Sequence, residues 1–232
     1  MKTILITAPL RQDADIFREY QKSLDGLEVP EGYAVRRFFV VNDCPDVIPE
    51  IRDAEYVTAD TQDEYRKTAG DHIWTLELMA KMSGLRNMTI RKMLEGGFDY
   101  WFSIDTDLIV DPATLKTLIA ADKDIVSEIF WTQHWCNAWD YDQYSPPKEE
   151  WRKPGLYKVG MTGACTLVKR NVFEAGVDYT QIPNICKALR GEDRHFCIRA
   201  ACAGFEMWVD THCPAVHLYT REEYENYKAG KR

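Results

Sequence analysis

Two aspartates stand two positions apart at the end of an apolar run. Asp105 and Asp107 lie in the segment WFSIDTDLIVDP, residues 101–112. If residues 100–104 form a strand, the two side chains project from the same side of it, where their like charges repel. An ionised carboxylate is also costly to bury without a positive partner. Two explanations therefore stand side by side: a simple turn before Pro112, or a cation held between the carboxylates.

The second explanation predicts a particular kind of ion. Carboxylate oxygens in an Asp-X-Asp arrangement suit Mg²⁺ or Mn²⁺, which complete their coordination with substrate phosphates and water. A diphosphate leaving group is a natural partner for such an ion, because the metal neutralises the charge that builds up as the bond breaks.

Other polar residues follow the first two expected strands. Arg11 stands just after the first strand, and Asn42 and Asp43 follow the second. Ligands of parallel α/β sheets bind at the carboxyl ends of the strands, so these residues are candidates for the same site, although Asn42 and Asp43 also suit a plain turn. The sequence contains neither GxGxxG nor GxxxxGK[ST], which argues against a dinucleotide fingerprint or a P-loop.

A second acidic pair occurs late in the chain. Glu192 and Asp193 lie in GEDRHFCIRAACAGFEMWVD, residues 191–210, where a helix is expected to begin. They are either capping and first-turn charges or a catalytic base at a rigid helix start. His217 follows seven residues after the expected end of a strand at Asp210. It is either a structural or exposed histidine or the last ligand of a metal site.

The elements that must position these residues alternate between strand and helix. Residue patterns predict strands over 2–8, 35–42, 55–59, 100–104, 124–130, 156–159, 164–168 and 206–210, and helices over 13–24, 72–94, 112–121, 170–175 and 193–203. The longest helix is expected to be interrupted or bent near Ser83 and Gly84 and to end at Gly96 and Gly97. This order predicts an α/β fold with a mainly parallel central sheet flanked by helices.

Composition narrows the class of protein. The chain has 232 residues, of which 45% are hydrophobic, and this predicts one sizeable core. The net charge is −8 without a long basic run, so nucleic acid is not an expected partner. No apolar stretch reaches the length of a membrane span, and the start lacks a signal-peptide pattern, so we expect a soluble, cytoplasmic protein. The seven cysteines form no CxxC pair and are expected to be reduced.

Two segments carry less pattern. Residues 131–151, WTQHWCNAWDYDQYSPPKEEW, are rich in tryptophan and are expected to form an ordered loop or a short antiparallel excursion. Trp131 and Trp135 could stack on the apolar faces of sugar rings, at the donor sugar or the acceptor. The competing explanation is a hydrophobic lid or a dimer patch. Residues 221–232 are expected to be a charged, solvated or frayed tail.

The order of these motifs resembles that of the GT-A glycosyltransferases, in particular the family-2-like, DxD-containing members. The resemblance rests on ILITAPLR at 4–11, VVNDCPD at 40–46, LRNMTIRKMLEGGFDYWFSIDTDLIVDP at 85–112, GMTGACTLVKRNVFEAG at 160–176, GEDRHFCIRAACAG at 191–204 and His217. It implies a single domain over residues 1–220, with a nucleotide-binding half at 1–107 and an acceptor half at 108–220, before the tail.

The resemblance also implies roles. The implied ligands of a Mn²⁺ or Mg²⁺ ion are Asp105, Asp107 and His217. The implied contacts of the donor nucleotide are Ala8, Pro9, Arg11, Asp43, Arg86, Arg91, Asp105 and Thr106. The segment under the donor sugar would contain Gly163, Ala164 and Cys165. Asp193, beside Glu192, would be the base that removes the acceptor's hydroxyl proton.

The resulting expectation is a metal-dependent glycosyltransferase. It would move a sugar from a UDP- or GDP-linked donor to a hydroxyl acceptor such as a glycan or glycolipid, with inversion if Asp193 is the base. Retaining members share the same motifs, and VNDCPD lacks the usual D-D-x-S run, so the stereochemistry and the base stay open. The alternatives are a sugar-nucleotide nucleotidyltransferase, although TAPLRQDAD lacks that class's glycine-rich loop, and a non-catalytic carbohydrate-binding module.

Overall fold

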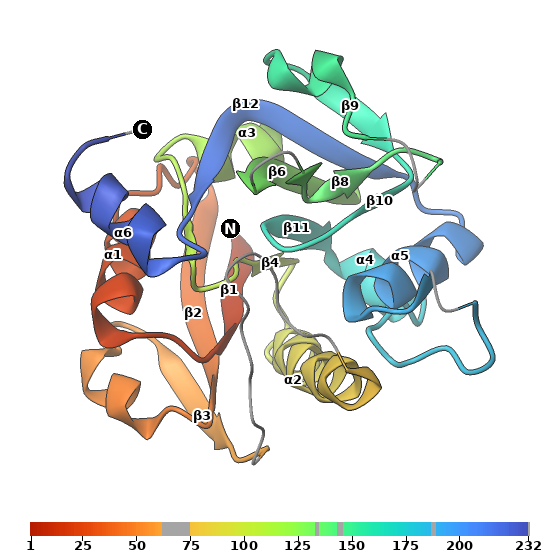
Figure 1. The fold of residues 1–232 in the computed structure, drawn as a ribbon. Helices are drawn as coiled ribbons and strands as arrows, with labels where there is room; N and C mark the ends of the chain where they lie inside the picture. The colour runs from red at the N-terminus through yellow and green to blue at the C-terminus, as the bar shows by residue number, and fades with distance from the viewer. Residues whose placement is uncertain (62–74, 133–134, 143–145, 187–188, 232) are drawn as a thin grey trace.

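The chain folds around one large mixed sheet covered by helices (Figure 1). The computed structural model describes residues 1–61, 75–132, 135–142, 146–186 and 189–231. The strands are β1 Lys2–Leu10, β2 Tyr33–Asn42, β3 Glu55–Ala59, β4 Tyr100–Ser103, β5 Leu108–Ile109, β6 Ile125–Thr132, β7 Trp135–Cys136, β8 Ala138–Trp139, β9 Leu156–Val159, β10 Met161–Thr162, β11 Thr166–Lys169 and β12 Met207–His217. The helices are α1 Ala14–Asp25, α2 Leu76–Glu95, α3 Thr114–Ala120, α4 Arg170–Glu174, α5 Glu192–Cys202 and α6 Arg221–Lys228, with 3₁₀ turns η1 Pro45–Glu50 and η2 Glu149–Arg152.

The strand order creates a natural binding crevice. The main sheet runs β3-β2-β1-β4-β11-β6-β12-β5. The first four of these strands are parallel to one another, as are β6 and β12, whereas β11 is antiparallel to both of its neighbours. The chain leaves β1 on one side to form β2 and β3 and later returns to its other side as β4. Such a switch in strand order is where α/β sheets bind ligands, and the predicted α/β class with a mainly parallel sheet is confirmed.

Alternation along β1 distributes its side chains between two cores. Ile4 and Ile6 pack with Phe17 of α1 on one face, in a core that also receives residues of α3 and α6. Leu5 points to the other face and packs in a core shared with α2, α4 and α5. Because the strand is apolar on both faces, helices must cover both, which gives three layers.

Helix α2 differs from its prediction. It runs without a break from Leu76 to Glu95, through Ser83 and Gly84, so the predicted interruption is wrong. The Ser83 hydroxyl donates to the Met79 carbonyl at 2.9 Å, which satisfies it inside the helix. The helix ends at Gly96, as expected, and its predicted first residues, 72–74, lie outside the described residues.

The end of the chain is more ordered than expected. Strand β12 continues past Asp210 to His217, with an irregular register between Asp210 and Ala215. Residues 221–228, expected to be solvated or frayed, form α6 with a capping box at Thr220 and a buried Tyr224. The predicted antiparallel excursion after β6 is present, since β7 pairs with β6 and β8 with β10.

In the part of the chain that the structure describes, no helix combines the length and the apolar character that crossing a bilayer requires.

Candidate active site

A pocket of about 330 Å³ lies at the carboxyl ends of β1 and β4, in the crevice that the strand order predicts. Its walls come from both halves of the chain. Its lining residues are Pro9, Arg11, Gln12, Asn42, Leu78, Met82, Arg86, Asp105, Thr106, Asp107, Phe130, Thr132, Trp135, Cys136, Asn137, Trp139, Gly163, Ala164, Glu192, Asp193, His217 and Tyr219. Both acidic pairs singled out in the sequence therefore face one space.

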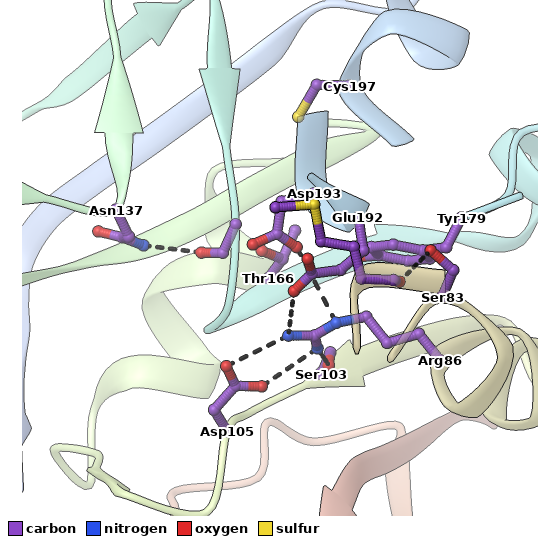
Figure 2. A network of polar contacts seen from close by, with 12 residues as sticks. Ser83, Arg86, Ser103, Asp105, Asn137, Thr166, Tyr179, Glu192, Asp193 and Cys197 are labelled. Atoms are coloured by element: carbon purple, nitrogen blue, oxygen red, sulfur yellow. Dashed lines mark hydrogen bonds and ion pairs between the residues drawn. The ribbon is translucent and has the colours of Figure 1, made fainter. Parts of the chain in front are cut away.

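Asp105 is held by a buried arginine. The two terminal nitrogens of Arg86 contact the two carboxylate oxygens of Asp105 at 3.1 and 3.2 Å, and Arg86 also donates to Ser103 Oγ at 3.2 Å (Figure 2). The Arg86 side chain is only 3% exposed. Burial opposes its charge, but the carboxylate of Asp105 and then that of Asp193 outweigh burial, so the pKa of Arg86 lies well above its ordinary value.

Asp107 points to a different partner. Its Oδ2 lies 3.4 Å from His217 Nε2, and the Asp107 carbonyl accepts a hydrogen bond from the Leu218 amide at 2.8 Å. The antiparallel pairing of β5 with β12 sets Leu108 opposite His217 and so fixes this meeting. Burial lowers the pKa of His217, but the hydrogen bond to Asp107 and its charge prevail, and the pKa is raised.

Glu192 and Asp193 lie in the first turn of α5; Glu192 is buried and Asp193 is partly buried. Glu192 Oε1 lies 3.8 Å from Arg86 Nη2, and Asp193 Oδ1 lies 4.0 Å from Arg86 Nε, as Figure 2 shows. Burial raises the pKa of Glu192 to about 7, with the charge of Asp193 adding to it. Burial likewise raises the pKa of Asp193 to about 6, although Arg86 opposes the rise. Carboxylates with pKa values near 6 to 7 exist in both protonation states near neutral pH and are basic enough to take a proton.

Two glycines make room for this acidic turn. Gly191 precedes α5 with φ of 141°, a conformation that side chains rarely adopt. At Gly163, a Cβ atom would overlap with the carboxylate of Asp193. The neighbouring Ala164 has φ of 52°, uncommon for alanine, and also lines the pocket. The backbone at 163–164 is thus shaped to bring the chain close to Asp193.

Arg11 and Asp43, expected to contact the nucleotide, form an ion pair 3.6 Å long. Asp43 accepts hydrogen bonds from the Thr61 amide at 2.8 Å and from the Thr61 hydroxyl at 2.6 Å. Arg11 lines the main pocket, whereas Asp43 lines a second hollow of about 480 Å³ beside β2 and β3. The ion pair therefore joins the two spaces.

The side-chain oxygen of Asp107 and the ring nitrogen of His217 suit a divalent metal as ligands. Ligand atoms about 2.1 Å from one ion lie about 3–4 Å apart, in the range of the Asp107–His217 separation. Thr132 Oγ1 lies 2.9 Å from His217 Nδ1 and so directs Nε2 to Asp107, as orienting partners of metal-bound histidines do. Within the described residues, no group of three or more His, Cys, Asp and Glu side chains is arranged to hold an ion. Phosphate or water oxygens would have to complete the coordination.

The structure brings most of the expected residues together. Besides the acidic residues, the pocket lining includes Pro9, Arg11, Arg86, Thr106, Gly163, Ala164, Trp135 and His217. Asp105, expected among the metal ligands, instead faces Arg86. Five expected residues lie outside this lining. Ala8 and Cys165 are buried, Arg91 is exposed on α2, Trp131 lies under the guanidinium of Arg152, and Asp43 lines the second hollow.

Sequence reasoning missed two polar residues in the aromatic segment. Thr132 orients His217, and the buried Asn137 hydrogen-bonds to the backbone of Glu128 and Gly163. Asn137 stands between the apolar residues Cys136 and Ala138, and that isolation was the one signal in the sequence. A polar side chain between apolar neighbours in a strand is either exposed or satisfied inside, and pattern alone does not distinguish these.

Comparison with known proteins places the fold. No family model and no curated protein matches the sequence. Among solved structures, the mannosyltransferase PcManGT of Pyrobaculum calidifontis, in complex with GDP-Man and Mn²⁺, is similar over 97% of this chain and 59% of its own, with 13% identity and a TM-score of 0.58. S. aureus TarS in complex with UDP-GlcNAc is similar over 97% of this chain and 61% of its own, with 10% identity and a TM-score of 0.55.

A third solved structure agrees. The Drosophila β1,4-galactosyltransferase 7, in complex with manganese, UDP-Gal and xylobiose, is similar over 97% of this chain and 74% of its own, with 13% identity and a TM-score of 0.52. This chain thus has the GT-A-like fold of these glycosyltransferases, while spanning about 60% of the length of the first two.

Proposed function

We propose that this chain is a glycosyltransferase that moves a sugar from a UDP- or GDP-linked donor to a hydroxyl group of a glycan or glycolipid, with Mn²⁺ or Mg²⁺ as cofactor. One observation carries the proposal: the two acidic pairs of the sequence line a single pocket at the switch point of a GT-A-like sheet. The solved structures of similar fold were obtained with UDP-GlcNAc, GDP-Man and UDP-Gal, which supports a nucleotide-sugar donor.

The charges of the pocket support a metal on the donor side. Four carboxylates line it, and the charge of Arg86 is shared among Asp105, Glu192 and Asp193. A donor diphosphate would meet net repulsion there without another cation. Asp107 and His217 would hold the ion, which when bound neutralises charge on the departing diphosphate. Arg11 stands nearby, where its guanidinium suits a phosphate oxygen.

Asp193 is the better candidate for the base. Its side chain is 23% exposed, against 9% for Glu192, so an acceptor has more access to it. In the proposed step, Asp193 takes the proton of the acceptor hydroxyl while that oxygen bonds to the anomeric carbon and the nucleotide diphosphate leaves from the opposite face. The product has inverted anomeric configuration.

The aromatic segment forms the acceptor side. Trp135 is 56% exposed although it lines the pocket, and Trp139 lines it as well. A large exposed aromatic face beside a polar pocket suits the apolar face of a sugar ring. A glycan acceptor stacked on Trp135 would thus reach the same space as Asp193.

The proposal is tested first by a thermal-shift screen of UDP- and GDP-sugars with and without Mn²⁺. A ligand that binds only the native state raises the melting temperature in proportion to its affinity. We expect stabilisation by one nucleotide series, only when the metal is present. Donors found in this way are then incubated with glycan acceptors, and transfer is followed by mass spectrometry.

Asp107→Ala then separates the candidate functions. A glycosyltransferase should lose metal-dependent donor binding and transfer, whereas a carbohydrate-binding module would keep sugar binding through its tryptophans. Asp111→Ala, an exposed aspartate outside the pocket lining, is the matched control. Full transfer by Asp107→Ala with the metal chelated would refute the proposal. Formation of a nucleotide sugar from a sugar phosphate and a nucleoside triphosphate would instead identify a nucleotidyltransferase.

A further inference from the structure

Asn137 is a buried amide at the meeting point of three chain segments. It stands between β7 and β8 and is 5% exposed. Its Oδ1 accepts from the Phe130 amide at 3.0 Å, and its Nδ2 donates to the Glu128 carbonyl at 3.0 Å and the Gly163 carbonyl at 2.9 Å. Its own carbonyl accepts from the Gly163 amide at 3.1 Å. Both the N–H and the C=O of Gly163 are thus hydrogen-bonded to one residue, Asn137.

The hydrogen bonds between Asn137 and Gly163 affect the surroundings of the Asp193 carboxylate. The space that a Cβ on Gly163 would fill is occupied by the Asp193 carboxylate. Asn137 therefore fixes the backbone that presses against that carboxylate, and this wall helps to bury it. Burial is the largest cause of the raised pKa of Asp193.

The Asn137 side chain also holds the aromatic part of the pocket lining in place. Trp135 and Trp139 are each two residues from Asn137, on either side, and both line the pocket. The hydrogen bonds of Asn137 to β6 hold this stretch in place, while Thr162 donates from its hydroxyl to the Asn137 carbonyl at 3.3 Å. One residue is thus linked to the proposed stacking surface and to the proposed base.

We propose that Asn137 is a positioning residue. Through Gly163 it holds the aromatic surface formed by Trp135 and Trp139 in place relative to the carboxylate of Asp193. The inference rests on the proposed function, because it assigns those two features their roles. Asn137 does not itself contact reacting atoms in this account. Its loss should lower the rate of transfer and leave the donor side, at Asp107 and His217, unchanged.

The test compares Asn137→Ala, Gly163→Ala and the double variant. Each single change should lower kcat by about 10- to 100-fold, since misplacement of about 1 Å in a catalytic group has effects of that size. In Asn137→Ala, binding of the donor with Mn²⁺, measured by thermal shift, should stay within about threefold. The double variant should be little worse than the poorer single variant, because both changes disturb one contact. Additive losses, or a kcat that does not change in the single variants, would overturn the proposal.

A general loss of stability is excluded with Gln21→Ala. Gln21 is also a buried amide with both ends bonded to backbone, donating to the Glu50 carbonyl at 2.8 Å and accepting from the Arg52 amide at 2.9 Å, but it lies on α1 outside the pocket lining. It should lose comparable stability and keep its kcat. If Gln21→Ala lowers kcat as much as Asn137→Ala does, Asn137 acts only through stability and the proposal fails.

A second readout does not depend on activity. In protein with ¹³C-labelled aspartate carboxyls, the Asp193 signal is assigned by its absence in Asp193→Asn and titrated in the wild type and in Asn137→Ala. Loosening of the wall should let water in and move the pKa of Asp193 towards the ordinary aspartate value of about 3.9. An unchanged pKa would refute the role of Asn137. If the wild type transfers no sugar but this pKa moves, the proposed function fails while the positioning by Asn137 stands.

Discussion

The two acidic pairs that line the pocket differ in how their charges are balanced. Asp105 and Asp107 sit two residues apart after β4 and turn to separate partners, Arg86 and His217. Glu192 and Asp193 are adjacent at the start of α5 and approach the same arginine, at 3.8 and 4.0 Å. The first pair is divided between an arginine and a histidine, whereas the second pair shares the one arginine that already contacts Asp105.

This difference explains why the second pair is the better candidate for proton transfer. Asp105 makes a direct bidentate contact with Arg86. The contacts of Glu192 and Asp193 with the same arginine are longer, so Arg86 balances their negative charges only in part. Burial then raises the pKa of both into the range of about 6 to 7. A single buried arginine thus separates a carboxylate that it contacts directly from two whose pKa burial raises.

The largest expected effect is that of removing the shared cation. Arg86→Met should lower the free energy of unfolding at pH 7.5 by about 3–5 kcal/mol, because it leaves buried carboxylates without a counter-charge. The loss should be smaller at pH 5, where Glu192 and Asp193 bind protons. Urea denaturation at the two pH values measures both quantities.

The matched control lies on the same helix. Arg91 is exposed on α2, so Arg91→Met should change stability by less than about 0.5 kcal/mol at either pH. Arg86→Lys keeps the charge but not the bidentate contact and should recover part of the loss. Equal stability of the Met variants at positions 86 and 91 would remove the basis of the comparison.

Substitutions in the second pair, Glu192 and Asp193, should have the next largest effect, which is on turnover. Asp193→Asn should lower turnover about 10²- to 10⁴-fold, the usual contribution of a general base, whereas Glu192→Gln should lower it less than about tenfold. A base acts when ionised, so the wild-type rate should rise with pH through about 6, where Asp193 loses its proton. Steady-state kinetics from pH 5 to 8 provide the check, and a greater loss in Glu192→Gln would transfer the role to Glu192.

These pairs also mark how far sequence reasoning reaches. The strand before Asp105 and the helix at Asp193 follow from local patterns of apolar and turn residues, and β3 was predicted with its observed bounds, 55–59. The partners of the carboxylates could not be foreseen in the same way. The contact of Arg86 with Asp105 joins residues 19 positions apart, and it depends on how α2 packs against β4.

The irregular strand β12 shows the same limit. Between Asp210 and Ala215 it advances five residues while β6 advances two, from Glu128 to Phe130. Residue patterns ended this strand at Asp210, since the irregular stretch breaks the alternation of apolar residues. His217 returns to the sheet beyond it, and only the tertiary pairing of β12 with β5 brings it to Asp107.

For the first pair, the sharpest test is the metal requirement. His217→Gln should raise the Mn²⁺ concentration needed for half-maximal transfer by about 10- to 100-fold and leave the pH dependence assigned to Asp193 in place. His212→Gln is the control, because His212 lies on the same strand with a side chain 47% exposed and contacts Asp210 rather than the pocket. The same Mn²⁺ requirement in both variants would remove His217 from the proposed metal site.

A third buried acid shows what happens without an arginine. Glu128 is fully buried in β6, and in the described part of the chain no arginine or lysine contacts it and its Oε2 has no hydrogen-bond partner. Burial, and next the charge of Asp210, raise its pKa from an ordinary 4.5 to about 9. The pKa of Glu192, which is also buried but lies near Arg86, stays at about 7, and that of the partly exposed Asp193 at about 6.

This contrast predicts a gain in stability that depends on pH. Because the native state holds the Glu128 proton more tightly than the unfolded chain, the stabilisation from this group is complete below about pH 4.5 and is lost as pH rises towards 9. Glu128→Gln cannot ionise, so its stability relative to wild type should rise by up to about 4 kcal/mol between pH 4.5 and pH 8. The exposed Glu31→Gln should show no such trend. Parallel stability curves for Glu128→Gln and wild type would mean that burial alone does not raise the pKa of an acid here, and Arg86 would then no longer explain the difference between the pairs.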